Sequence, residues 1–162
     1  RITPLQFATS VFLVLMLAGG LGRILGGKLG DVIGALPTYI IMSVGQTVSV
    51  FWFPYLDQTW SLYLLAMIFG FTYSGVMSSI LVCVRMMVSA RFSARAMSVT
   101  SFFGWTGMGL GGFFGGLFYD MNGDYKLSFA FASLMGLLNI IILTAFYMRA
   151  KGQRISASPQ PA

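Results

Sequence analysis

One arginine lies inside an apolar segment near the start of the chain, and a glycine-spaced aspartate follows it. Arg23 stands in the run from Pro4 to Gly26, eight residues before Asp31. If this run continues as a helix to the aspartate, the guanidinium lies about 12 Å inside the helix. A cation at that depth in a membrane is costly unless it lines a watery cavity or meets an anion. A carboxylate suits it, because guanidinium binds carboxylate through two parallel hydrogen bonds.

Arg23 also has a purely structural interpretation, in which its side chain extends to the phosphates at the membrane surface. No acidic residue lies in any apolar run to neutralise it. Two aromatic residues, Tyr73 and Trp105, fall in the middle of other apolar runs, too deep to anchor at a membrane interface. They are candidates for the wall of a cavity, with simple core packing as the alternative for each.

The elements that must position these residues are membrane helices. Apolar residues make up 57% of the chain and charged residues only 9%, whereas a soluble domain has about 25% charged residues. The charges are grouped between runs of about twenty apolar residues, which is typical of an all-α polytopic membrane protein. Residues 1–150 are predicted to form a bundle of five transmembrane helices, and residues 151–162 a disordered tail. The helices are expected at about 4–26, 36–55, 60–88, 96–118 and 125–148.

The composition also argues against several functions. His and Glu are absent, and the one cysteine, Cys83, has no partner for a disulfide or a metal cluster. We therefore expect neither an enzyme, nor a cofactor, nor a metal site. The net charge of +6 comes from basic residues at helix ends, so it indicates membrane topology rather than nucleic-acid binding.

The distribution of charge predicts an orientation in the bilayer. The second and fourth connections carry Asp57, Asp120 and Asp124 against Lys126 alone, and Asp31 is the only acid on the other side. The first, third and last connections carry the basic residues Lys28, Arg91, Arg95, Arg149, Lys151 and Arg154. By the positive-inside rule the basic set lies in the cytoplasm, so the carboxy-terminus is cytoplasmic. The membrane is expected to be the inner or plasma membrane of the cell.

Asp31 and Arg85 are predicted to form a pair on the cytoplasmic side, bridging the first connection and the end of the third segment. Arg91 is the alternative donor to Asp31. A contact between Arg85 and lipid phosphates is the simpler interpretation.

The fourth segment is unusually rich in glycine. Gly107, Gly111 and Gly115 recur every four residues and therefore share a helix face. Small residues at this spacing let two helix backbones approach closely in lipid, which predicts a packing face. Static packing and a flexing role are both open.

Several motifs in this order resemble the major facilitator superfamily. Gly27-Lys28-Leu29-Gly30-Asp31-Val32-Ile33-Gly34 is similar to its cytoplasmic G-x-x-x-D-x-x-G signature. A basic connection from Arg91 to Arg95 follows, and then the glycine-rich segment. The block at 115–125, with Phe129 after it, is similar to the end of the second half of monocarboxylate-porter-like members. The resemblance covers about residues 4–150 and implies spans eight to twelve of twelve, with the amino-terminal half missing.

Two features depart from the family pattern. Val32 and Ala35 stand where the family usually has basic residues, which weakens a full charge relay. Gly19 stands where the monocarboxylate branch commonly has an aspartate, one turn before the arginine that Arg23 would match. The acid for proton coupling would then come from the missing half.

The resemblance implies two groups of functional residues. The cytoplasmic signature and gate would comprise Gly27, Asp31, Gly34, Arg85 and Arg91. The residues that reach the substrate cavity would be Arg23, Tyr73, Ser101 and Trp105.

The leading hypothesis is a fragment of a secondary transporter that moves a small organic anion, with a monocarboxylate as the narrower expectation and Arg23 as the anion contact. One alternative is a transporter of neutral or cationic solutes, in which Arg23 is structural or gates the path. Another is a non-transporting membrane subunit that assembles through the glycines of the fourth segment. In each case the partners are the lipid bilayer and the missing half of the same protein.

Overall fold

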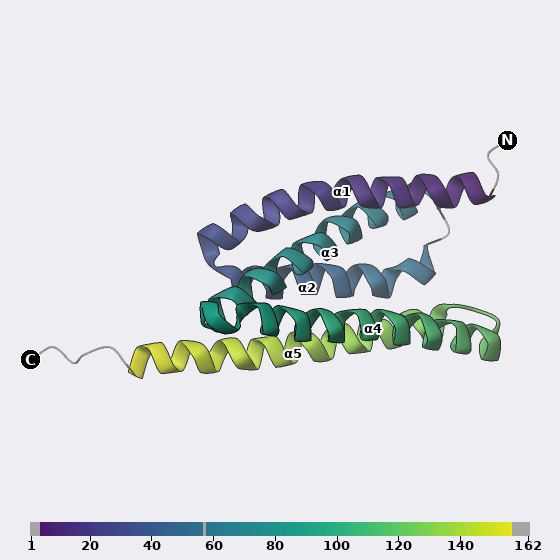
Figure 1. The fold of residues 1–162 in the computed structure, drawn as a ribbon. Coiled ribbons are helices and arrows are strands. Elements are labelled where there is room, and N and C mark those ends of the chain that lie inside the picture. The colour runs from purple at the N-terminus through teal and green to yellow at the C-terminus, as the bar shows by residue number, and fades with distance from the viewer. Residues whose placement is uncertain (1–3, 57, 157–162) are drawn as a thin grey trace, which may run out of the picture.

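The protein is a bundle of five long helices, seen here in a computed structural model that describes residues 4–56 and 58–156 (Figure 1). No β-strand occurs among these residues. The long helices are α1 (Pro4–Ile33), α2 (Ala35–Trp52), α3 (Thr59–Met87), α4 (Ser93–Asn122) and α5 (Lys126–Ser156). The short 3₁₀ helices η1 (Phe53–Tyr55) and η2 (Ala90–Phe92) lie in two of the connections. The predicted all-α fold with five helices is confirmed.

Four of the long helices are both long enough and apolar enough to cross a membrane. The candidate spans are Leu5–Ile33, Ala35–Tyr55, Thr59–Met87 and Lys126–Lys151. α4 has 30 residues, which is about 45 Å and ample for a bilayer core of about 30 Å. Its many glycines lower the mean hydropathy of α4, so α4 is not among the candidate membrane spans.

Three boundaries differ from those expected. α1 continues through Ile33, where a connection was expected from Gly27, and α4 continues to Asn122, where a turn was expected from Tyr119. α5 reaches Ser156, so the first six residues of the expected disordered tail are helical, and residues 157–162 lie outside the described chain. Glycine and polar residues lower helix propensity, but each added helical residue satisfies backbone groups that lipid cannot.

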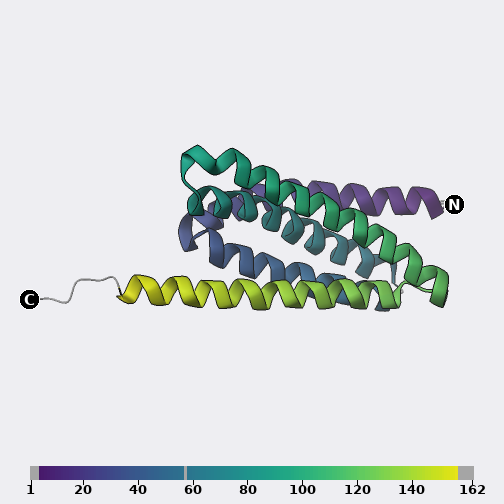
Figure 2. The ribbon, with the colours of Figure 1, turned by 60° about the horizontal axis from the view of Figure 1, so that its bottom comes forward.

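α3 is the central helix of the bundle. α1 and α2 both pack against it, α5 packs against α2, and α4 lies at the edge against α3 and α5. α1 and α2 converge at Gly34 and diverge along their length, as Figure 1 shows. α4 and α5 converge at the opposite end and diverge in the other direction (Figure 2).

Glycines bring α1 and α3 into backbone contact. A Cβ added at Gly22 would lie 2.8 Å from the Cα of Phe71, and one added at Gly70 would lie 3.1 Å from the Cα of Leu15. A Cβ at Gly26 would lie 3.1 Å from the Cα of Gly75. Side chains at these positions would push the helices apart, so the glycines are required for this crossing.

The glycines of α4 make no close helix contact within the described bundle, so a packing role for Gly107, Gly111 and Gly115 stays a prediction. A Cβ added at any of the three would meet nothing within 4 Å. No residue of α4 is buried, because the helix lies at the edge and contacts the bundle along only part of its length. Among the described residues, glycines of α1 and α3 make the close backbone contacts.

Aromatic rings and one hydrogen bond hold α4 to α5 near their shared turn. Phe131 of α5 packs against Phe114 and Phe118 of α4, with ring centroids 6.0 and 5.5 Å apart. The hydroxyl of Ser128 donates to the carbonyl oxygen of Gly115 at 3.1 Å. Gly123 ends α4 with φ of 71°, a left-handed conformation that suits glycine.

The α1–α3 crossing predicts a position-specific effect of adding one methyl group. Gly22→Ala forces the new Cβ into the Phe71 backbone, and we expect a loss of about 1–3 kcal/mol in stability. Gly20→Ala is the matched control, because a Cβ there meets nothing within 4 Å. Thermal unfolding of both purified variants in detergent checks this. Equal unfolding temperatures for the two variants would contradict the proposed crossing.

Candidate functional site

One end of the bundle collects most of the basic side chains. The end of α1, the start of α2 and the α3–α4 connection lie together there, and α5 extends past them (Figure 1). This region is called the basic end below, and its residues are Lys28, Arg85, Arg91, Arg95, Arg149 and Lys151. Asp120 and Asp124 lie at the opposite end, at the α4–α5 turn, while Asp57 lies outside the described residues. The tertiary structure thus gathers residues from α1, α3, α4, α5 and the α3–α4 connection on one side.

Arg23 lies within the apolar length of α1. The helix runs on to Ile33, so Arg23 is ten residues, or about 15 Å, from its end at the basic end. Its side chain is exposed, and the described carboxylates of Asp31, Asp120 and Asp124 all lie at helix ends. In the described part of the chain, Arg23 is therefore a deep cation with no acidic partner.

Tyr73 belongs to a ladder of aromatic rings that joins three elements. Its ring stacks on Phe69 of α3 with centroids 5.7 Å apart, and Phe69 meets Phe53 of η1 edge to face at 6.1 Å. Phe53 in turn stacks on Phe129 of α5 at 5.9 Å. The ring of Tyr73 is thus half-buried against its neighbours, which supports the packing interpretation for that part of the side chain.

Ser101 and Trp105 lie four residues apart on α4 and therefore share a face. Both are exposed, with Trp105 73% accessible. Nothing in the described bundle covers this part of α4.

The four predicted substrate residues lie at different depths along three helices. Measured from the helix ends at the basic end, Ser101, Arg23, Trp105 and Tyr73 are about 12, 15, 18 and 21 Å deep. α1 and α4 each pack against α3, which carries Tyr73. The residues thus lie on α1, α3 and α4.

Gly34 is the one residue between α1 and α2, and its backbone requires glycine. Its φ and ψ are 95° and 153°, a region that residues with a Cβ essentially do not adopt. Gly27 is different, because it lies inside α1 and a Cβ there meets nothing within 4 Å. Within the signature, glycine is therefore needed at position 34 for the backbone conformation of the turn. At position 27 a side chain would fit without a clash.

Thr38 is a residue of this turn that sequence reasoning missed. It is fully buried, and both its backbone N–H and its hydroxyl donate to the carbonyl oxygen of Gly34, at 3.2 and 2.8 Å. The amide of Gly34 donates to Gly30 at 3.0 Å, so the short connection satisfies its own backbone. A threonine four residues after the last signature glycine was the available signal.

Neither proposed partner of Asp31 contacts it in this structure. Asp31 and Arg85 are exposed at the ends of α1 and α3, and no ion pair joins them among the described residues. The guanidinium of Arg91 lies over the ring of Phe92 at 5.7 Å, a cation–π contact.

A second missed contact joins α1 and α3 away from the basic end. The hydroxyls of Ser10 and Tyr63 form a hydrogen bond, and Phe7 meets the ring of Tyr63 edge to face at 5.7 Å. Ser10 also donates to the carbonyl oxygen of Phe7 at 2.8 Å. The hydrogen bond between Ser10 and Tyr63 joins α1 to α3 at the end of the pair that is away from the basic end.

The described side chains offer no metal centre, because no group of three His, Cys, Asp or Glu residues occurs among them.

Long apolar helices, a deep arginine and a one-residue glycine turn at the basic end define a polytopic membrane protein built around α3. A family model of the Major Facilitator Superfamily matches residues 2–162, and the chain belongs to that family of transporters. No curated protein and no solved structure matched the chain.

The geometry of the turn predicts that the two signature glycines differ in their tolerance of a side chain. Gly34→Ala places a Cβ in a backbone conformation that costs about 1–3 kcal/mol, so we expect a lower unfolding temperature. Gly27→Ala is the control and should leave stability unchanged, since its Cβ enters open space. Thermal unfolding in detergent distinguishes the two. A variant at Gly34 that is as stable as one at Gly27 would rule out the strained turn.

Proposed function

We propose that this chain is the carboxy-terminal part of a secondary transporter that moves a small organic anion, with Arg23 as the contact to the anion. The observation that carries the proposal is the position of Arg23, exposed about 15 Å inside α1 with no carboxylate beside it in the described residues. The monocarboxylate class is the narrower form of the proposal. It draws on the resemblance of the 115–125 block to that branch.

The cost of an unpaired arginine supports this role. An arginine at the centre of a membrane helix costs about 2.5–3.5 kcal/mol on insertion scales, so such residues line water-filled paths or meet counter-ions. A bound carboxylate removes that cost through a pair of charge-assisted hydrogen bonds. Because the anion supplies the partner only when it is bound, Arg23 discriminates between the loaded and the empty site.

The fold suits transport by alternating access. The backbone contact between α1 and α3 makes these helices a single unit, so the unit that carries Arg23 moves as a body. The missing amino-terminal half would face the exposed sides of α1 and α4, with Ser101 and Trp105 toward the cavity. In this proposal the protein lies in a cell membrane, and the basic end is on the cytoplasmic side.

One observation favours a second candidate, a membrane subunit that does not transport. Gly107, Gly111 and Gly115 lie on a face of α4 that no helix of the bundle covers. A partner helix on that face would make the close contact that the spacing predicts. Co-purification with a membrane partner, together with no uptake of any solute, would favour this candidate.

Uptake of labelled lactate or pyruvate by the full-length protein in vesicles tests the role of Arg23. Arg23→Ala removes charge-assisted hydrogen bonds of about 1.5–3 kcal/mol, so we expect uptake at low substrate concentration to fall by about tenfold or more. Arg23→Lys keeps the charge but loses the planar fork, and an intermediate value is expected.

Arg95→Gln is the control for Arg23, because it removes an exposed basic residue at the basic end. It should transport at nearly the wild-type rate. Uptake that is unchanged in both Arg23 variants would exclude the anion contact and favour a transporter of neutral or cationic solutes.

We also propose that Asp31 pairs with Arg85 in one conformation of the transport cycle. Both residues lie at the basic end on helices that pack along their length. Asp31→Asn and Arg85→Gln should therefore reduce uptake non-additively, with a coupling of about 0.5 kcal/mol or more in a double-mutant cycle. Strict additivity of the two losses would count against direct coupling.

A further inference from the structure

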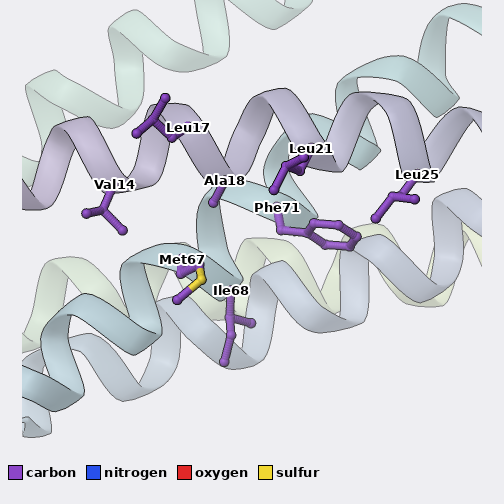
Figure 3. A pocket seen from close by; sticks show the side chains of 8 residues that line it. All are labelled: Val14, Leu17, Ala18, Leu21, Leu25, Met67, Ile68 and Phe71. Atoms are coloured by element: carbon purple, nitrogen blue, oxygen red, sulfur yellow. The ribbon is translucent and has the colours of Figure 1, made fainter.

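An apolar groove runs along α1 and α3, and α2 lines its second part. Its first part is a hollow of about 460 Å³ between α1 and α3, in which Phe71 of α3 lies between Leu21 and Leu25 of α1 (Figure 3). The second part, about 640 Å³, continues toward the basic end and also includes Leu25 and Phe71. Because the two hollows share these residues, they form one groove.

The groove has one charged group, Lys28, which lies in its part at the basic end. Thr72 also lines it, but its hydroxyl donates to the carbonyl oxygens of Ile68 and Phe69 at 2.8 and 3.1 Å, so it offers no free donor. The other lining side chains are apolar, with Val32 82% accessible beside Lys28. Such a surface suits an amphiphile with one anionic group and a hydrocarbon chain.

The apolar part of the groove is long enough for one acyl chain. The α1 residues that line the groove run from Val14 to Val32, about 27 Å along the helix, and those on the far side of Lys28 from the basic end run from Val14 to Leu25, about 17 Å. One half of a hydrocarbon core of about 30 Å is about 15 Å. With Lys28 at the headgroup level, the apolar part of the groove therefore covers the depth of an acyl chain.

This groove is separate from the face that carries Arg23. Leu21 and Leu25 line the groove, and each is two residues from Arg23 along α1. Residues two positions apart in an α-helix point to nearly opposite sides. A ligand in the groove therefore does not occupy the proposed anion site, and its binding does not depend on the proposed function.

We propose that this groove binds an anionic phospholipid, with an acyl chain along α1 and α3 and the headgroup phosphate on Lys28. The charge of Lys28 is complementary to the phosphate, and the lysine lies at the end where basic residues face the anionic lipids of the inner leaflet. The bound lipid fills the space between α1 and α2 and holds their angle.

Lipid retention tests the headgroup contact. The full-length protein is reconstituted in vesicles of phosphatidylglycerol and phosphatidylethanolamine and re-extracted in mild detergent, and native mass spectrometry counts the lipids that stay bound. Lys28→Gln should lower the retained phosphatidylglycerol by about fivefold, the effect of about 1 kcal/mol per basic residue near the surface. Lys28→Arg should restore it. Arg95→Gln, which removes the same charge at the same end outside the groove, should retain as much as the wild type.

A second pair of variants tests the acyl chain. Leu21→Trp fills the groove, whereas Ile24→Trp adds the same bulk to the same helix outside it, and the two native side chains are similarly exposed at 60% and 61%. We expect bound phospholipid to fall in Leu21→Trp alone, at equal unfolding temperatures. Equal retention in Lys28→Gln and Arg95→Gln, or in the two tryptophan variants, would overturn the proposal.

Discussion

Where α1 crosses α3, Gly22 lies against the backbone of Phe71 and Gly70 lies against that of Leu15, so no side chain separates the two helices. In lipid, burying apolar surface between helices contributes little free energy, so close packing of the helix backbones stabilises the pair instead. The hydroxyl bond between Ser10 and Tyr63 fixes the same pair farther along. The position of α3 then determines where the other helices dock.

The small core follows from this arrangement. The most buried side chains include Ala66, Thr38 and Ser49 rather than large apolar residues, and many of the large apolar side chains are exposed on the outside of the bundle. Thr38 and Ser49 donate to carbonyl oxygens four residues earlier, so the buried hydroxyls are satisfied within their own helix. The apolar groove lies along α1 and α3, and the side chain of Arg23 is exposed on α1.

Arg23 is the main exception to this apolar pattern, and its energetics connect the fold to transport. The helix that holds it packs closely against α3, which fixes the position of Arg23 along the bundle. In the function that we propose, a charge at a fixed depth in the membrane would meet an anionic substrate.

The sequence by itself determined the all-α membrane class, the five helices and the charged ends, because hydropathy and charge spacing are local properties of the chain. It placed Arg23 about 12 Å from Asp31 along a continuous helix, and the end of α1 at Ile33 then set the distance to the helix end at about 15 Å. It did not determine which glycines pack. Gly107, Gly111 and Gly115 have the more regular spacing, yet Gly22, Gly26 and Gly70 make the contacts. Spacing defines a helix face, but only the tertiary arrangement decides whether another helix covers that face. The tertiary arrangement also decided the backbone conformation at Gly34, the burial of Thr38 and the position of the groove.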